Sequence, residues 1–137
     1  MTFILDTETI KVINLFETAS QINVKDCIIM DDRIYILARE GELKKVGENG
    51  YILKSLEKML KKKIIIFEYS KDVSTFLKNS VKGIREIRIR NEKEKTTIEI
   101  SVENAFKSLA IGKDGKNIKA LRQFLKRNYN IDNLVIK

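Results

Sequence analysis

Residues 112–115 read Gly-Lys-Asp-Gly, and Gly-Glu-Asn-Gly at residues 47–50 has the same pattern 65 positions earlier. A branched apolar residue precedes each tetrapeptide, Val46 in the first copy and Ile111 in the second. Apolar residues at helical spacing follow each copy: Leu53, Leu56 and Leu60, then Ile118, Leu121 and Leu125. A pattern that recurs at one fixed period indicates two copies of one structural unit.

The repeat divides the 137 residues into two units of just under 70 residues each, which we place at 1–70 and 71–137. In the first, the patterns predict a helix from Asp6 or Thr7, strands at 24–30 and 33–38, a short helix at 41–46, a helix at 51–62 and a strand at 64–69. In the second, they predict a helix from Asp72 or Ser74, two strands joined by a turn at 91–95, helices at 103–110 and 116–129, and a strand at 134–136. Both units are therefore expected to be α+β.

The positive charge of the chain lies entirely in the second unit. Residues 1–70 carry 11 basic and 11 acidic side chains, whereas residues 71–137 carry 16 basic and 8 acidic ones. This difference accounts for the whole net charge of +8. A one-sided excess of this size favours a polyanionic partner for the second unit over a merely solvated surface.

The composition argues against several classes of protein. The chain has no His and a single Cys, Cys27, in an apolar run, so we expect a core cysteine, no disulfide, no metal site and no catalytic thiol. No paired-carboxylate motif is present, and residues 110–117 lack the first Gly and the Ser/Thr of a nucleotide-binding P-loop. The longest apolar run, at 64–67, is too short to span a membrane. We therefore predict a cytoplasmic protein that is not an enzyme, uses no cofactor and has no small-molecule substrate.

The second tetrapeptide has the chemistry of a phosphate clamp. Glycines at a turn between two helices remove side chains where a phosphodiester backbone would lie, and the start of the following helix presents unpaired N–H groups. Lysines nearby add mobile positive charge. The residues that we expect to contact RNA here are Ile111, Gly112, Lys113, Asp114, Gly115, Lys116, Asn117, Ile118, Lys119 and Arg122. Ile111 and Ile118 are candidates to line a groove for bases, and core packing is the alternative for both.

The sequence resembles a pair of K-homology (KH) domains of the bacterial-type topology, helix-strand-strand-helix-helix-strand. Residues 110–118, Ala-Ile-Gly-Lys-Asp-Gly-Lys-Asn-Ile, are similar to the family's signature of an apolar residue, Gly-x-x-Gly, two residues and an aliphatic residue. Two such units with nothing added resemble in particular the archaeal NusA-like transcription termination/antitermination proteins. The resemblance covers essentially the whole chain and implies binding of single-stranded RNA.

The first copy departs from the KH pattern. Its loop, Gly47, Glu48, Asn49 and Gly50, carries an acid in place of a lysine. The preceding helix lacks apolar anchors, since Gly41 and Lys44 stand where the second copy has Phe106 and Leu109. We interpret this loop as the weaker half of an RNA surface; the alternative is a packing partner only.

The resemblance implies a non-catalytic role in transcription elongation, termination or antitermination, with single-stranded RNA as partner and RNA polymerase as a second candidate partner. One alternative is a KH protein of the ribosome or of translation. Another is an adaptor that docks on RNA polymerase and no longer binds RNA. The basic side chains of Lys113 and Lys116 favour RNA binding, because a retired loop has no reason to remain basic.

Overall fold

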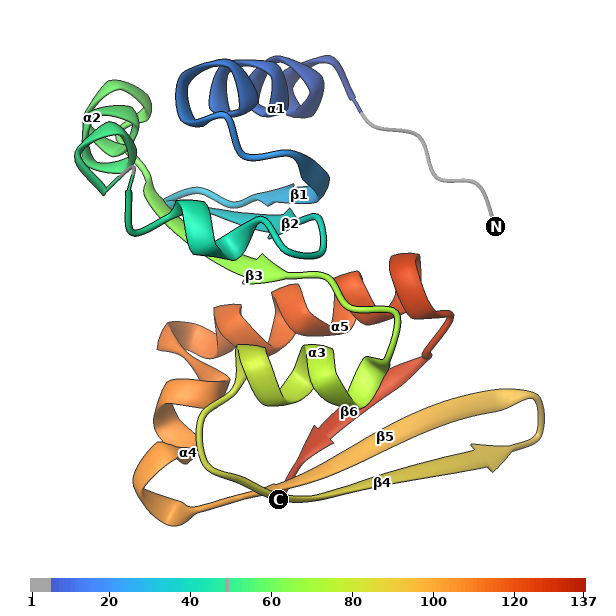
Figure 1. The fold of residues 1–137 in the computed structure, drawn as a ribbon. Coiled ribbons are helices and arrows are strands. Elements are labelled where there is room, and N and C mark those ends of the chain that lie inside the picture. The colour runs from blue at the N-terminus through green and yellow to red at the C-terminus, as the bar shows by residue number, and fades with distance from the viewer. Residues whose placement is uncertain (1–5, 49) are drawn as a thin grey trace. The chain divides into compact units, whose positions relative to one another are not determined.

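The structure is a computed structural model that describes residues 6–48 and 50–137. These residues form two compact units, one ending at Lys71 and the other running from Asp72 to Lys137. Each unit has the element order helix, strand, strand, helix, helix, strand (Figure 1). The α+β class and the bacterial-type KH order predicted from the sequence are therefore confirmed.

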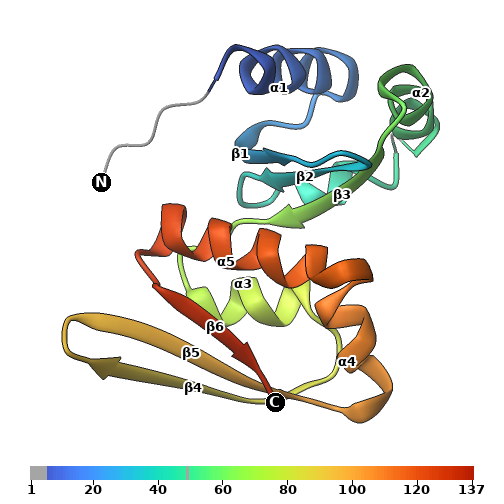
Figure 2. The same ribbon diagram turned by 180° about the vertical axis from the view of Figure 1, so that it is seen from behind.

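The first unit consists of α1 (Thr7–Ser20), β1 (Val24–Ile29), β2 (Arg33–Ala38), the 3-10 helix η1 (Leu43–Lys45), α2 (Gly50–Leu60) and β3 (Lys63–Glu68). The strands form a sheet in the order β1-β2-β3. β1 is antiparallel to β2, and β2 is parallel to β3. Both α1 and α2 lie on the same face of this sheet, as both ribbon views show (Figures 1 and 2).

Caps and apolar packing hold the first unit together. Asp6 is the N-cap of α1, and its side-chain oxygen accepts a hydrogen bond of 2.7 Å from the Thr9 N–H. The core joins the inner faces of the helices to the sheet, and its buried members are Phe16, Ile22, Val24, Cys27, Ile34, Ile36, Ala38 and Leu56. Cys27 is 2% exposed, so the prediction of a core cysteine is confirmed.

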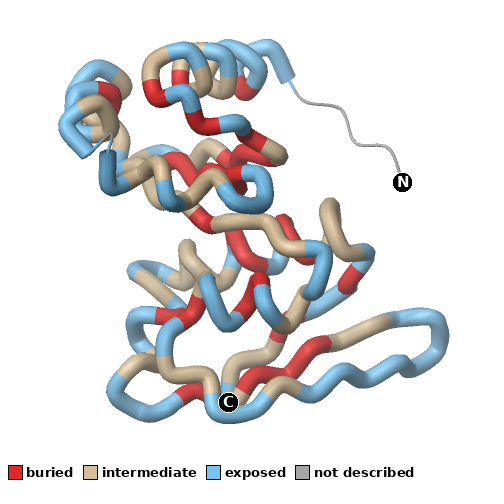
Figure 3. Tube along the Cα trace, viewed as in Figure 1, coloured by how far each residue is buried: buried red, intermediate tan, exposed pale blue. Residues whose placement is uncertain are grey.

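The second unit consists of α3 (Val73–Ser80), β4 (Ile84–Glu92), β5 (Lys95–Val102), α4 (Asn104–Ile111), the 3-10 helix η2 (Lys113–Gly115), α5 (Lys116–Tyr129) and β6 (Asn133–Ile136). Its sheet has the order β4-β5-β6, with β4 antiparallel and β6 parallel to β5. α3, α4 and α5 cover one face (Figures 1 and 2). The far end of the β4–β5 hairpin extends past these helices and is exposed (Figure 3).

The second core is built around α5. The sequence predicted this helix at 116–129, and the structure has the same bounds. Its inner face buries Ala120, Leu121, Phe124 and Leu125. From α3, the Phe76 ring stacks on Tyr129 with the ring centroids 5.2 Å apart. Because α5 packs on its sheet through these buried side chains, the position of its first turn is fixed. The second Gly-x-x-Gly loop lies at that first turn.

Most predicted boundaries differ from the structure by one or two residues, and three of these differences have a local cause. The turn predicted at 91–95 contains only Lys93 and Glu94, because the strands extend further on both sides. Both turn residues have positive φ (48° and 68°), as a tight two-residue hairpin requires, but neither is a typical turn residue. α4 begins one residue later than predicted, with Glu103 as its N-cap, and ends at Ile111. α2 is shifted to Gly50–Leu60, since the chain turns at Lys61 with φ of 56°.

Candidate nucleic-acid interface

Gly112 adopts a backbone conformation that in practice only glycine allows. It follows the last residue of α4 with φ of 79° and ψ of 171°. Its N–H donates to the Ser108 carbonyl at 2.9 Å, and its own carbonyl accepts from the Gly115 N–H at 3.1 Å. These bonds end α4 and close the loop on itself.

Residue 112 must also be glycine because the loop passes very close to α5. A Cβ at Gly112 would lie 2.6 Å from the Cβ of Asn117 and 3.0 Å from its backbone nitrogen. The Asn117 side chain in turn donates from Nδ2 to the Ala110 carbonyl at 3.1 Å. Asn117 was predicted to contact RNA; its amide here binds the end of α4 and so pins the two helices at a fixed spacing.

The loop leads into α5 without a side-chain cap. Asp114 and Gly115 both have left-handed conformations, with φ of 55° and 71°. Gly115 is the N-cap of α5, and no side chain accepts a hydrogen bond from the first turn there. The positive end of the helix dipole therefore faces the loop with no acidic side chain capping it, an arrangement suited to an anion.

Basic side chains follow the loop along α5. Lys113 and Lys119 are exposed, and Lys116 is half-buried. Arg122 is exposed as a residue, yet its Nε donates to the Leu134 carbonyl of β6 at 3.1 Å. This hydrogen bond keeps the Arg122 guanidinium group next to β6. Four cations and one acid, Asp114, lie between residues 113 and 122.

Apolar side chains flank the same loop. Ile111 is 41% exposed, which removes core packing as its explanation, and Ile118 is half-buried. Leu109, one turn before the loop, is 62% exposed. Leu109 was not predicted as a contact residue, because its spacing of three residues from Phe106 favours an inward position on the helix; the structure shows it exposed. Exposed aliphatic groups beside a phosphate clamp offer a surface for unstacked bases.

The first loop lacks these features. A Cβ at Gly47 or at Gly50 would meet no atom within 4 Å, and Gly47 does not have a positive φ. Glu48 is exposed, and Asn49 lies outside the described residues. The predicted short helix before this loop is only the three residues of η1. Glycine is thus not required at these positions by close packing.

One of the two lysines just before the first loop is engaged within its own unit. Lys45 forms an ion pair with Glu42 at 2.9 Å and donates to the Gln21 carbonyl at 3.1 Å. The hydrogen bond from Lys45 lowers the pKa of the Glu42 carboxyl below its usual range. Val46, which corresponds to the exposed Ile111, packs against the core of its own unit. The two loops therefore share a sequence pattern and differ in exposed chemistry.

Other kinds of site find little support in the part of the chain that the structure describes. No helix there is long and apolar enough to cross a bilayer. Among residues 6–48 and 50–137, no three His, Cys, Asp or Glu side chains are grouped so as to hold a metal ion.

Comparisons with known proteins agree with this architecture. The family model for the NusA-like second KH domain matches residues 73–134. The Probable transcription termination protein NusA of Thermoplasma acidophilum is 29% identical over 136 residues, covering 97% of this chain and 94% of that protein. The protein of the same name from Methanococcus vannielii is 31% identical over 117 residues, covering 83% and 68%. The crystal structure of APE1850 superposes with a TM-score of 0.78 at 31% identity, covering 97% of this chain and 100% of that one.

Proposed function

The chain belongs to the archaeal NusA-like family of KH proteins, and on that basis we propose that it binds single-stranded RNA through the second Gly-x-x-Gly loop. We further propose that it acts without catalysis in transcription termination or antitermination. The names of its relatives support the transcription role. The RNA-binding role is supported by the residues themselves.

The observation that carries the proposal is the backbone of residues 112–115. Gly112 is the one loop residue whose conformation and close packing both exclude a side chain. The loop ends on the uncapped N-terminus of α5. A phosphate placed there would accept hydrogen bonds from backbone N–H groups and meet Lys113 and Lys116.

Specificity for a single strand follows from the apolar neighbours. Leu109 and Ile111 are exposed beside the clamp, where a base turned out of its stack would contact them. A duplex keeps its bases paired and stacked, so only its phosphates could reach this surface. We therefore expect duplex RNA to bind more weakly than a single strand of the same length.

The test is the salt dependence of binding to a labelled single-stranded RNA, measured by fluorescence anisotropy on the full chain. Three or four phosphate contacts at the second loop would give a log–log slope of roughly −2 to −3. A slope near zero, or equal affinity for duplex RNA, would overturn the proposed binding mode. Crosslinking in cells then separates the roles: nascent transcripts support transcription, whereas ribosomal RNA supports the translation alternative.

A further inference from the structure

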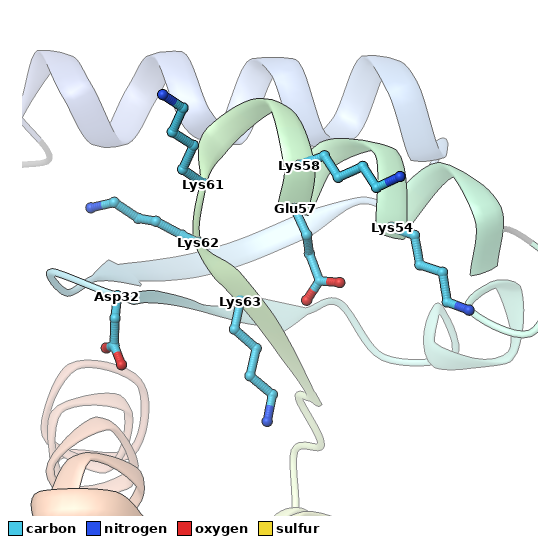
Figure 4. A pocket seen from close by; sticks show the side chains of 7 residues that line it. All are labelled: Asp32, Lys54, Glu57, Lys58, Lys61, Lys62 and Lys63. Atoms are coloured by element: carbon cyan, nitrogen blue, oxygen red, sulfur yellow. The ribbon is translucent and has the colours of Figure 1, made fainter.

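A basic pocket lies in the first unit, at the end of α2 opposite to its Gly-x-x-Gly loop. It has a volume of about 420 Å³, and its walls come from α2, from the turn into β3 and from the β1–β2 turn. The residues that line it are Asp32, Lys54, Glu57, Lys58, Lys61, Lys62 and Lys63 (Figure 4). Five of seven lining side chains are therefore lysines.

The tight end of α2 brings these lysines together. Lys61 has φ of 56° and reverses the chain, while the Lys62 N–H donates to the Glu57 carbonyl at 3.2 Å. The Lys62 ammonium group also donates to the Met30 carbonyl at 2.8 Å. Helix and strand thus meet at one rim, with Lys54 on the helix and Lys63 on the strand pointing to the same side (Figure 4).

The charge of this pocket is not neutralised locally. Glu57 accepts the Ile64 N–H at 2.8 Å and keeps its negative charge, whereas Asp32 pairs with Arg33 at 3.1 Å, so five lysines face two acids of which one has a cation of its own. Within residues 6–48 and 50–137, Lys54, Lys58, Lys61 and Lys63 form no ion pair that would hold them. Of the 11 basic side chains in residues 1–70, five line this pocket together with only two of the 11 acidic ones. The neutral sum of the first unit therefore conceals a concentrated basic site.

A stripe along α2 connects this pocket to the start of the helix. Tyr51, Lys54 and Lys58 follow one another at spacings of three and four residues, which places them along one side of the helix, and Lys61 stands just beyond its last residue. Tyr51 is 73% exposed, although burying a tyrosine ring is favourable. An exposed aromatic ring in line with lysines is the pattern by which proteins stack bases and hold phosphates of single strands.

Helix stability alone does not explain the arrangement. Lysines in the last turn of a helix interact favourably with the negative end of its dipole, which accounts for Lys58. Lys54 lies further back in α2, and Lys63 belongs to β3. Neither gains from the dipole in this way, so both are left as exposed charges on a shared rim.

We propose that the first unit binds single-stranded RNA through this lysine pocket and the Tyr51 stripe, with the backbone phosphates at the lysines and a base stacked on Tyr51. The inference rests on the proposed function for the identity of the ligand. It assigns the contact to the outer side of α2 instead of to the Gly47–Gly50 loop.

The test compares two double charge reversals in the full chain, with the anisotropy and salt series measured on a labelled single-stranded oligouridine. Lys58→Glu/Lys61→Glu should lower affinity about tenfold or more and make the log–log salt slope shallower by about 1.4, the value for two lost phosphate contacts. The control Lys11→Glu/Lys71→Glu makes the same change in charge on exposed side chains outside the pocket. It should alter affinity by less than about threefold and leave the slope unchanged, because only long-range electrostatics are affected. Equal effects of the two doubles would overturn the inference.

A neutral variant guards against loss of folding. Lys58→Gln/Lys61→Gln places no acid at the helix end and should still reduce the slope, while the circular dichroism spectrum stays that of the unmodified protein. Acetylation of surface lysines, read by mass spectrometry, gives a second measurement: RNA should protect Lys54, Lys58 and Lys63 but not Lys11. A lack of protection would overturn the inference.

The outcomes also distinguish this inference from the proposed function. If Lys113→Glu abolishes binding and the pocket variants behave as the control does, only the pocket inference fails. If the unmodified protein binds no single-stranded RNA, both fail.

Discussion

The two loops share the Gly-x-x-Gly pattern in the sequence, but their first glycines have different surroundings. The second is fixed by Gly112, whose φ of 79° and 2.6 Å Cβ contact with Asn117 leave no room for a side chain. At Gly47, the equivalent position, a Cβ would meet nothing within 4 Å. The position equivalent to Asn117 in the first unit is Ile52, which packs against the core and has no amide to bind the preceding helix. A shared motif therefore need not be a shared site.

The proposed binding sites of the two units lie at different places in the KH fold. In the second unit, the glycine loop, the start of α5 and the exposed Leu109 and Ile111 are next to one another in the chain. In the first unit, the basic groups gather at the other end of α2, around Lys61. A duplicated KH unit can thus keep its fold while its exposed charge moves to another surface.

The largest expected difference between the two loops is the loss of protein stability when their first glycine is replaced by alanine. Gly112→Ala should lower the free energy of unfolding of the second unit by about 3 kcal/mol, because it adds backbone strain and a contact that cannot relax easily. Gly47→Ala should change stability by less than about 0.5 kcal/mol. Urea unfolding followed by circular dichroism measures both. Similar losses would show that the first loop is as tightly built as the second.

Exchanging charges between the loops tests RNA contact directly. Lys113→Glu should weaken binding of a single strand about tenfold, since an acid then faces the phosphate at the helix start. The reciprocal change, Glu48→Lys, should improve binding by less than about twofold, because the surrounding loop is not shaped as a clamp. Anisotropy at fixed salt gives both values. A gain from Glu48→Lys as large as the loss from Lys113→Glu would mean that charge alone decides the difference.

Removing the amide that joins the helices should have a smaller effect. Asn117→Ala leaves the Ala110 carbonyl without its 3.1 Å partner and should cost about 1 kcal/mol of stability. RNA affinity should fall with it, because the clamp loses its fixed spacing. Asn117→Asp keeps the size of the side chain and removes the donor, so it should resemble Asn117→Ala. Full stability in both variants would contradict the role assigned to this amide.

The smallest expected effect is the loss of a helix cap. It should be the same in both units, because the first helix of each has an aspartate as its N-cap. Asp72 caps α3, and hydrogen bonds from the Thr75 side chain and backbone lower the pKa of its carboxyl below the usual 3.8. A lowered pKa in the folded state stabilises the protein above about pH 4, and this contribution is lost as the pH falls through the folded value. Asp72→Ala and Asp6→Ala should each lower the melting temperature at pH 7 and have little effect near pH 2. A pH-independent loss would contradict the capping explanation.

Much of the fold follows from local patterns in the sequence. Apolar residues at helical spacing and the glycine after Ile111 predict α5 with its observed bounds, and both aspartate caps are visible as residues. The turn between β4 and β5 was predicted at 91–95, but its narrowing to Lys93 and Glu94 was not, because strand pairing imposes the left-handed conformation on two residues that do not favour it.

The site was only partly predictable for a related reason. The basic residues and glycines of the second loop are neighbours in the sequence, so they could be predicted together. The contact of Asn117 with RNA remains a prediction; the sequence did not show that its amide donates to the Ala110 carbonyl. The lysine pocket combines a helix face, a strand and a distant turn at Asp32, and total charge per unit hides it. Such features depend on the reversal of the chain at Lys61, which one-dimensional periodicity does not locate.

The most direct test of the account is an NMR titration of the full chain with a short single-stranded RNA, following the backbone amide signals of both loops. The amides of residues 112–118 should shift strongly and saturate together, because the phosphate binds at the start of α5. The amide of Gly47 should stay within the scatter of uninvolved residues. Shifts of equal size at both loops, or none at residues 112–118, would contradict the claim that the second loop is the RNA clamp.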